Sequence, residues 1–370
     1  MNEPITYVGI DAHTRELQVA VLIGATGTPV SWTCSTEPRA LDRLRHKLER
    51  SAPGVIECCY EAGPGGYTLQ RALSSGRIRC RVIAPSLIPQ KPGERVKTNR
   101  RDARKLVELL RADVLTAVRV PTVDEEAVRD LCRARDDARD DLMRTRQRLG
   151  KLLLRRGLIY HGRNWTKRHR EWLDQLAWGH PAERHVVTDY RLMLAHVDAR
   201  ITEIDRLLEQ LAATPPYGRP VSVLRCFRGI DTVTAMTLLT ELHDFRRFQR
   251  ARAVMAFVGL VPGERSTGER TRRGPITKMG NGLVRRLLVE AAWHYRHEPR
   301  IGAALRQRRL GQPAAAVAIA DKAQQRLCRR YRCLCARQKP TPLVVVAVAR
   351  ELIGFVWAAL QLPEAQPLTT

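Results

Sequence analysis

The sequence predicts an α/β domain at the N-terminus followed by an all-α remainder, and three observations support this division. Apolar segments at residues 5–11, 17–23 and 29–34 are separated by short turn-like stretches, so they read as three antiparallel strands. Strand and helix patterns then alternate to about residue 110, which is typical of an α/β sheet. Beyond residue 124, long charged segments carry Leu or Val at helical spacing.

The order of elements in the first third indicates a topology. After the three strands we predict a helix through Leu41, Leu44 and Leu48, a strand over 55–60, a helix over 67–75, a strand over 78–84 and a helix that begins at Asn99. This is the element order of a ribonuclease-H-like domain. The alternative, a doubly wound nucleotide-binding fold, lacks a GxGxxG or GxxxxGK[ST] motif at the place where such a fold needs it.

Two long helices are predicted in the middle of the chain, over residues 124–160 and 181–213, and their heptad-like pattern favours a coiled coil. Residues 144–170 contain ten Lys or Arg and no acid, and Tyr160, Trp165 and Trp172 lie within or beside them. This composition fits a surface that neutralises phosphates and stacks unpaired bases. The alternative is a solvated basic helix end. The candidate nucleic-acid contacts here are Arg155, Arg156, Lys167 and Arg168.

The last third of the sequence is predicted to be helical, after a Pro- and Gly-containing linker at residues 214–220. Residues 224–241 read as a helix, a tight turn at Gly229 and a second helix, a pattern similar to a helix-hairpin-helix that contacts DNA phosphates without reading sequence. A loop over 265–280 and a helix over 281–295 follow. Residues 322–339 add seven basic side chains without an acid.

The length of 370 residues and the apolar content of 44% fit two or three domains. We expect an α/β domain at residues 1–120, a helical coiled-coil connector at 121–220 and a helical C-terminal domain at 221–370.

The formal charge of +26 indicates a polyanionic partner, because such an excess attracts phosphates over about 8 Å at physiological salt. Nucleic acid is the leading candidate and a membrane surface the second. No run of about 18 apolar residues and no signal-peptide pattern is present, so a cytoplasmic protein without a membrane span is expected.

The nine cysteines do not form the pattern of a secreted disulfide framework. Cys328, Cys333 and Cys335 resemble half of a zinc site, but a second CxxC or paired histidines are missing, and buried thiols are the preferred interpretation.

Three carboxylates follow or begin elements of the predicted sheet. Asp11 ends the first strand, Glu61 ends the fourth and Asp102 lies in the first turn of the helix at Asn99. First and fourth strands are neighbours in this topology, so the three carboxylates are expected to meet at one sheet edge and bind Mg²⁺, with Mn²⁺ as a substitute. Each also has a structural explanation, since Asp11 and Glu61 fit turns and Asn99 with Asp102 resembles a capping arrangement.

Four segments together resemble a known family. YVGID, YEAGPGGY, VKTNRRDARKL and GLVPGERSTGERTRRGPITKMGNGLVRRLLVEAAW are similar to the signatures of the insertion-sequence-110 family of DEDD transposases, in the same order along nearly the whole chain. The resemblance implies a RuvC-like nuclease domain, a coiled-coil connector and a C-terminal transposase domain. It also implies a site-specific recombinase guided by a structured bridge RNA that pairs with donor and target DNA.

The resemblance assigns site residues and also shows a departure. The family's third acidic position is Asn99 here, so the metal set becomes Asp11, Glu61, Asn99 and Asp102, and Asn offers a neutral oxygen without negative charge. Ser266 matches the family's serine nucleophile, with Thr267 as a rival hydroxyl and a phosphate-binding loop as the alternative role. Basic residues near these positions are the remaining candidate nucleic-acid contacts: Arg100, Arg101, Arg270, Arg272, Arg273 and Lys278.

The function expected from the sequence is therefore a transposase that breaks and rejoins DNA with Mg²⁺ and Ser266 in the bacterial cytoplasm, associated with the nucleoid. Rejoining four strands needs more than one active site, so a homodimer or homotetramer is expected. The alternatives are a Holliday-junction-resolvase-like nuclease that uses only the carboxylates, and an architectural nucleic-acid-binding protein, which Asn99 favours.

Overall fold

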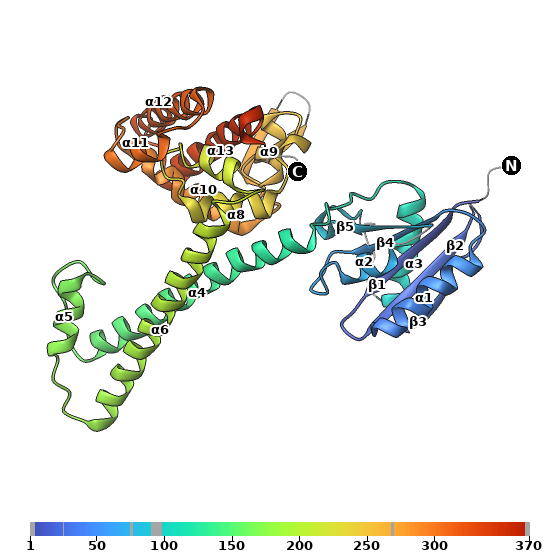
Figure 1. The fold of residues 1–370 in the computed structure, drawn as a ribbon, viewed down its shortest axis with the longest axis horizontal. Helices are drawn as coiled ribbons and strands as arrows, with labels where there is room; N and C mark the ends of the chain where they lie inside the picture. The colour runs from blue at the N-terminus through green and yellow to red at the C-terminus, as the bar shows by residue number, and fades with distance from the viewer. Residues whose placement is uncertain (1–3, 25, 75–76, 90–97, 268–269, 367–370) are drawn as a thin grey trace. The chain divides into compact units, whose positions relative to one another are not determined.

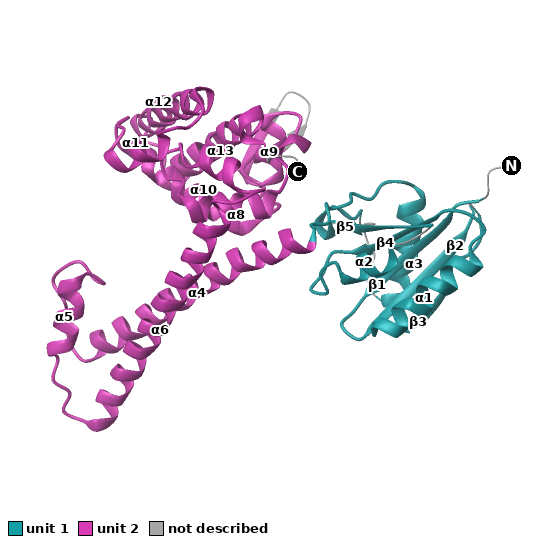
Figure 2. Ribbon diagram, viewed as in Figure 1, with its two compact units in different colours: residues 1–122 teal, residues 123–370 magenta. Residues whose placement is uncertain are grey.

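The computed structural model describes residues 4–24, 26–74, 77–89, 98–267 and 270–366, and the chain divides into two compact units, residues 1–122 and 123–370 (Figure 2). Each unit has hydrophobic clusters of its own, so the two are described separately.

The first unit is built on a five-stranded sheet with the order β3-β2-β1-β4-β5 (Figure 1). Its strands are β1 (Thr6–Ala12), β2 (Glu16–Ile23), β3 (Val30–Ser35), β4 (Ile56–Glu61) and β5 (Ile78–Ile83). The first three strands pair antiparallel, whereas β4 lies parallel to both β1 and β5. This confirms the mixed α/β domain, its five predicted strands and the expected pairing of the first strand with the fourth.

Helices cover both faces of this sheet. On one face, α1 (Pro38–Ser51) and α2 (Thr68–Leu73) bury Leu44, Leu48, Leu69 and Leu73 with Val8, Ile10 and Tyr60. On the other face, α3 (Asn99–Arg111) packs Ala103, Leu106, Val107 and Leu110 against β1, β2 and β4. A short 3₁₀ turn, η1 (Pro85–Leu87), follows β5. Helix α2 ends before the predicted boundary at residue 75, which lies outside the described residues.

The close approach of α3 to the sheet depends on Gly9. A Cβ atom at this position would lie 2.4 Å from the carbonyl oxygen of Ala103 and 2.8 Å from the amide nitrogen of Val107. Because backbone atoms cannot move aside as a flexible side chain can, only glycine allows this packing distance.

The second unit begins with two long antiparallel helices, α4 (Val123–Arg155) and α6 (Pro181–Leu211), with α5 (Lys167–Gln175) in the connection between them. Ion pairs join the helices in reverse order along the chain: Arg135 with Asp205 at 2.9 Å, Arg146 with Asp198 at 3.9 Å and Arg156 with Glu183 at 2.7 Å. The predicted helix pair is therefore present, and the first helix ends earlier than residue 160.

The remaining helices of the second unit enclose one large core. They are α7 (Gly218–Leu224), α8 (Thr232–Leu242), α9 (Ala251–Phe257), α10 (Gly282–Ala292), α11 (Ala303–Arg309), α12 (Ala314–Ala336) and α13 (Thr341–Leu360), with 3₁₀ turns η2 (Phe245–Arg247), η3 (Trp293–Arg296) and η4 (Pro363–Ala365). Cys132 of α4 and Leu208 of α6 belong to this core as well. The base of the long helix pair is thus part of the same packed body as the C-terminal helices.

Two predictions about this region were wrong. The linker predicted at 214–220 is partly helical, because α7 spans Gly218–Leu224. The helix before the turn at Gly229 therefore ends at Leu224, where the predicted helix was to begin. The predicted loop over 265–280 contains a β-hairpin, formed by β6 (Pro262–Thr267) and β7 (Arg270–Ile276). Its strands carry almost no apolar residues, so the usual alternation that marks a strand is absent.

Helix α13 is the one helix among the described residues that is long and apolar enough to cross a membrane by length and composition alone. More than half of it is buried inside the protein, where it contacts α7, α9, α10 and α12. Its position is that of a core helix. The cysteine prediction needs one correction, since Cys328 is buried but Cys333 and Cys335 are exposed on α12.

Candidate functional site

Asp11 and Glu61 lie side by side at the carboxyl ends of two adjacent parallel strands. The register of β1 and β4 pairs Gly9 with Cys59 and Ile10 with Tyr60, so Asp11 and Glu61 are the next residues on each strand. Neighbouring strands are about 4.8 Å apart. Side chains alternate between faces, and Gly9 and Cys59 face α3. The two carboxylates therefore share the face of the sheet that α3 covers.

The environments of these two carboxylates differ. The Asp11 side chain is 19% exposed, and one of its oxygens, Oδ2, lies 3.2 Å from Nε2 of His13. Glu61 is exposed and ends the strand just before the Gly63–Gly66 turn, to which the hydroxyl of Tyr60 donates a hydrogen bond at 3.0 Å. Burial raises the pKa of Tyr60 well above its usual value. Its hydroxyl therefore stays protonated and continues to donate to the turn.

Asp102 is placed by the start of α3. Thr98 is the N-cap of the helix, since its hydroxyl accepts a hydrogen bond from the amide of Arg101 at 3.4 Å. The capping role that the sequence suggested for Asn99 and Asp102 is therefore wrong, and neither side chain is needed to begin the helix. Asp102 directly precedes Ala103, whose carbonyl contacts the sheet at Gly9. Within the described ranges, the side chains of Glu61 and Asp102 make no ion pair or hydrogen bond.

The donor set fits a hard divalent ion in chemistry, because three carboxylates and the Asn99 amide offer only oxygen ligands. Among the residues that the structure describes, however, no three His, Cys, Asp or Glu side chains form a group that could hold a metal ion. A bound ion would have to draw the exposed Glu61 and the half-buried Asp102 towards Asp11. Asn99, Arg100 and Arg101 are exposed around this edge.

His13 was not among the predicted site residues, although a signal for it was available. It lies two residues after Asp11, and residues i and i+2 of an extended chain point the same way. Its side chain is 52% exposed and contacts the Asp11 carboxylate.

In the second unit, Ser266 is the next-to-last residue of β6 in the β6–β7 hairpin. The register pairs Ser266 with Thr271, Thr267 with Arg270 and Arg265 with Arg272. The side chains of residues 265–271, including Ser266, Thr267 and Arg270, lie outside the described part of the chain. Arg272, Arg273 and Lys278 are exposed. The backbone therefore places the predicted nucleophile on an arm whose described cations face solvent.

The base of this hairpin is anchored by contacts that the sequence prediction missed. The guanidinium of Arg285 donates to the carbonyl oxygens of Val258, Met279 and Gly280 at 2.8–3.2 Å. Gly259 and Gly280 have φ angles of +68° and +76°, and a Cβ on either would lie 2.1 Å from a backbone oxygen of the opposite segment. These residues fix where the arm leaves the core.

Asn281 continues the anchor into the core. It caps α10 by accepting from the amide of Val284 at 3.1 Å, and it donates to Glu241 at 2.6 Å. Glu241, whose side chain is 3% exposed, also receives two hydrogen bonds from Arg133 of α4 at 2.6 and 2.9 Å. One buried carboxylate thus connects α4, α8 and the segment that follows the hairpin.

The predicted basic contacts at the far end of α4 are mostly solvent-facing. Arg155, Arg156, Lys167 and Arg168 are exposed, and two of them are paired, Arg156 with Glu183 at 2.7 Å and Lys167 with Glu171 at 3.8 Å.

The three aromatic rings of this region do not form an exposed platform for bases. Tyr160, Trp165 and Trp172 surround the buried His169 ring, with centroids 4.9–5.6 Å from it. Burial lowers the pKa of His169. The two Trp side chains also pack against the buried cluster that contains Leu149 and Leu173. These rings build a small core at the tip of the helix pair.

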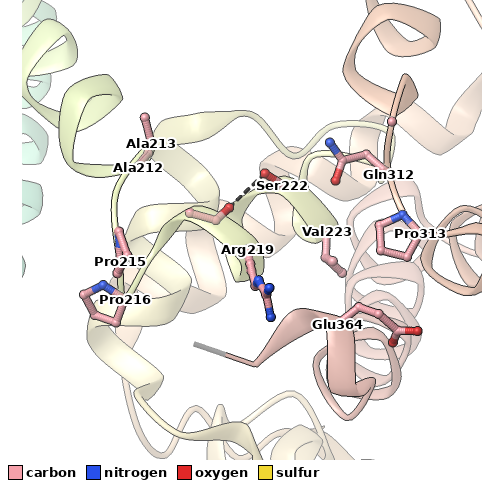
Figure 3. Close-up of a pocket in the computed structure, with 12 residues that line it drawn as sticks. Ala212, Ala213, Pro215, Pro216, Arg219, Ser222, Val223, Gln312, Pro313 and Glu364 are labelled. Carbon is pink, nitrogen blue, oxygen red and sulfur yellow. Dashed lines mark hydrogen bonds between the residues drawn. The ribbon is translucent and has the colours of Figure 1, made fainter. Parts of the chain in front are cut away.

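A cavity of about 520 Å³ lies between the end of α6 and the turn before α12 (Figure 3). Arg219 and Glu364 line it, and the hydroxyl of Ser222 donates to the carbonyl of Gly218 at 2.8 Å, so this serine is held by its own helix. None of the described residues that line this cavity is a histidine.

Two family models match this chain. Residues 8–156, which contain the carboxylate edge, match a transposase model of DEDD insertion-sequence-110 elements, and residues 221–306, which contain the hairpin, match the model described as Transposase IS116/IS110/IS902 family. These matches imply an enzyme class that cuts and recombines DNA.

Relatives extend this similarity over nearly the full length. A putative transposase y4qE of Sinorhizobium fredii is 43% identical over 359 residues, which cover 95% of this chain and 87% of the relative. The transposase for insertion sequence element IS1533 of Leptospira borgpetersenii is 35% identical over 338 residues, 90% and 97% of the two chains. The chain belongs to the IS110 family of insertion-sequence transposases.

Proposed function

We propose that this transposase breaks and rejoins DNA strands at the ends of its insertion sequence with a Mg²⁺ site and a serine nucleophile. In this proposal the first unit is a ribonuclease-H-like domain in which Asp11, Glu61 and Asp102 hold the ion and Asn99 adds a neutral oxygen. The observation that carries it is the position of Asp11 and Glu61, adjacent on parallel strands and on the face that α3 covers.

Ser266 has the second role in the proposal. Its hydroxyl oxygen attacks the scissile phosphorus, forms a phosphodiester bond with the protein and releases one DNA oxygen, which takes up the serine proton. Attack by a DNA hydroxyl on this linkage then rejoins the strands and restores the serine. Mg²⁺ would supply positive charge to the phosphate during these steps. Arg272 and Arg273 are exposed on the same arm, and Lys278 is exposed just after it. All three are suited to hold the phosphate.

The partners that follow from this proposal are donor and target DNA, a structured non-coding guide RNA and further copies of the chain in a homodimer or homotetramer. The charge of +26 supports polyanionic partners of this kind. We place the protein in the bacterial cytoplasm, associated with the nucleoid.

The test compares isosteric variants. Asp11→Asn, Glu61→Gln and Asp102→Asn should each lower strand cleavage by at least 100-fold. Removal of one charged ligand weakens binding of the ion and so reduces the stabilisation of negative charge in the transition state. DNA binding should remain. Asp42→Asn, an exposed carboxylate on α1, is the matched control and should keep full activity. Wild-type cleavage by all three site variants would disprove the metal site.

The serine is tested separately by trapping. A denaturation-resistant adduct between protein and DNA should form with wild-type protein and disappear in Ser266→Ala but persist in Thr267→Val. An adduct that depends on Thr267 would move the nucleophile by one residue.

A second function, an architectural DNA-binding protein without catalysis, is favoured by two observations. The site carries Asn99 in place of a fourth carboxylate, and its side chains do not converge in the described structure. Absence of any cleavage at high Mg²⁺ or Mn²⁺ concentration, together with tight DNA binding, would support it.

A further inference from the structure

Helix α12 carries a row of cations along one of its faces. Its buried side consists of Ala316, Ala320, Ala323, Gln324, Leu327 and Cys328, which pack in the core of the second unit. The opposite side carries six basic residues that line one groove with a volume of about 660 Å³: Lys322, Arg326, Arg329, Arg330, Arg332 and Arg337. We call this surface the α12 groove.

The charge of the α12 groove is largely unneutralised. Among the described lining residues Glu351 of α13 is the one acid, and its carboxylate is shared between Arg326 at 2.7 Å and Arg330 at 3.4 Å. Arg332 has only a 4.0 Å contact with the highly exposed Glu298. Within the described chain, the exposed side chains of Lys322, Arg329 and Arg337 make no ion pair or hydrogen bond.

Intramolecular stability does not account for this arrangement. Like charges at i, i+3 and i, i+4, as in Lys322 with Arg326 and Arg326 with Arg329, destabilise a helix by about 0.2–0.5 kcal/mol per pair. Cations can stabilise a helix at its C-terminal turn through the macrodipole. The last turn of α12 itself carries no basic residue, and of the row only Arg337, at the C-cap, lies where the macrodipole favours a cation, so this benefit does not account for the other five.

The shape and composition of the groove indicate the kind of polyanion it fits. From Lys322 to Arg337 the row extends about 22 Å along the helix at 1.5 Å per residue. None of the described lining residues is aromatic, so the groove lacks the aromatic platforms on which single-stranded nucleic acid usually stacks its bases. Arginine and lysine without base-reading partners contact the phosphates of a duplex and position it without reading its sequence.

We propose that the α12 groove binds the phosphate backbone of duplex DNA, independent of sequence and outside the carboxylate edge and the Ser266 arm. This inference rests on the proposed function only because that function identifies the polyanion as DNA rather than RNA. In the complex the phosphates neutralise Lys322, Arg329 and Arg337, whereas Arg326 and Arg330 remain tied to Glu351 and hold the groove in shape.

The experiment measures binding of the full chain to an arbitrary DNA duplex of about 30 base pairs, roughly 100 Å long, at several salt concentrations. The test variant is Lys322→Gln/Arg329→Gln/Arg337→Gln, which alters only exposed and unpaired side chains and so leaves folding intact. The control variant, Arg184→Gln/Arg252→Gln/Arg306→Gln, removes the same charge from exposed positions outside the groove.

Loss of three phosphate contacts should lower the slope of log affinity against log salt by about 2.7 and the affinity by on the order of 100-fold near physiological salt. The control variant should stay near the wild-type slope. Equal losses in both variants would show that only net charge matters and would overturn the proposal. A loss confined to duplex RNA of the same length would also overturn it, since the occupant would then be RNA.

A second readout locates the DNA. Cys333 lines the groove and is exposed, so in a Cys335→Ser background its alkylation rate reports access to the groove. Duplex DNA should slow alkylation of Cys333 several-fold in the wild-type groove and not in the triple variant. Unchanged alkylation at saturating DNA would overturn the proposal. Neither measurement depends on strand cleavage, so a catalytically inactive protein would leave the result of this test unaffected.

Discussion

At the scale of single residues, the carboxylate edge is organised by backbone contacts of its uncharged neighbours. Asp11 and Glu61 owe their common face to the parallel register of β1 and β4, and Asp102 owes its place to the contact between Ala103 and Gly9. None of these positions depends on the charges themselves. A carboxylate can therefore be changed at this edge with little effect on the fold.

Asn99 is the position where such a change is most informative. Asn99→Asp restores a fourth carboxylate on an exposed first turn, and an added negative charge near a divalent ion contributes about 1–2 kcal/mol even in water. The Mg²⁺ concentration for half-maximal cleavage should fall roughly tenfold. It is measured by titration of Mg²⁺ in a strand-cleavage assay.

The control for this prediction adds the same charge elsewhere. Asn164→Asp lies on an exposed segment of the second unit and should leave the Mg²⁺ titration unchanged. If Asn99→Asp and wild type require the same Mg²⁺ concentration, Asn99 is not a ligand position.

At the scale of elements, the β6–β7 hairpin depends on glycines at its base. Gly280→Ala should destabilise the second unit, because the positive φ costs about 1–2 kcal/mol and the new methyl group would overlap the carbonyl oxygen of Phe257. Overpacking of this kind adds about 1–3 kcal/mol. The change is measured by thermal unfolding and by proteolysis of the hairpin.

Gly311→Ala is the matched control for the steric part of this effect. Gly311 has a similar φ of +71°, but a Cβ there would meet nothing within 4 Å. Gly311→Ala should lower the free energy of unfolding only by the cost of the positive φ, about 1–2 kcal/mol. Equal losses of stability in both variants would show that the contact at Phe257 has no role.

The sequence predicted the elements of the sheet well, because alternation of apolar residues and short turns report directly on strands. All five strands and the pairing of the first with the fourth were confirmed. The hairpin could not be predicted, since its strands contain charged residues where alternation is usually read. The cap of α3 was assigned to Asn99 in place of Thr98, because both residue types cap helices and only the backbone decides between them.

The sequence predicted which residues belong to the candidate site, but not the contacts that their side chains make. Spacing placed Asp11, Glu61 and Asp102 at element ends, and it could also have indicated His13, two residues after Asp11. The anchoring by Arg285 needed coordinates. The aromatic segment shows the opposite failure. Tyr160, Trp165 and Trp172 read as a base-stacking surface because sequence cannot tell an exposed ring from one packed on His169.

At the scale of the whole molecule, the division at residues 122 and 123 separates two sets of cores. The clusters around Ile10 and around Val107 lie in the first unit, and those around Phe227, Leu149 and Val197 lie in the second. No cluster among the described residues takes members from both units.

Fragments 1–122 and 123–370 should therefore each fold alone, and the full chain should unfold as the sum of two transitions in calorimetry. A fragment that begins at residue 214 is the control. It loses Cys132, Leu208 and Ala212 from the large core, so it should be less stable than 123–370 by several kcal/mol, at about 2–5 kcal/mol for each large buried side chain removed. An unfolded 1–122 fragment at 25 °C would contradict the prediction.

The same boundary has an evolutionary meaning. A crossover between two related genes at the codons for Thr122 and Val123 would exchange one entire hydrophobic interior and leave the other untouched. Substitutions that had accumulated in one interior would need no compensation in the other. Lineages of such elements can therefore acquire a new first unit in one genetic step and keep the second unit unchanged.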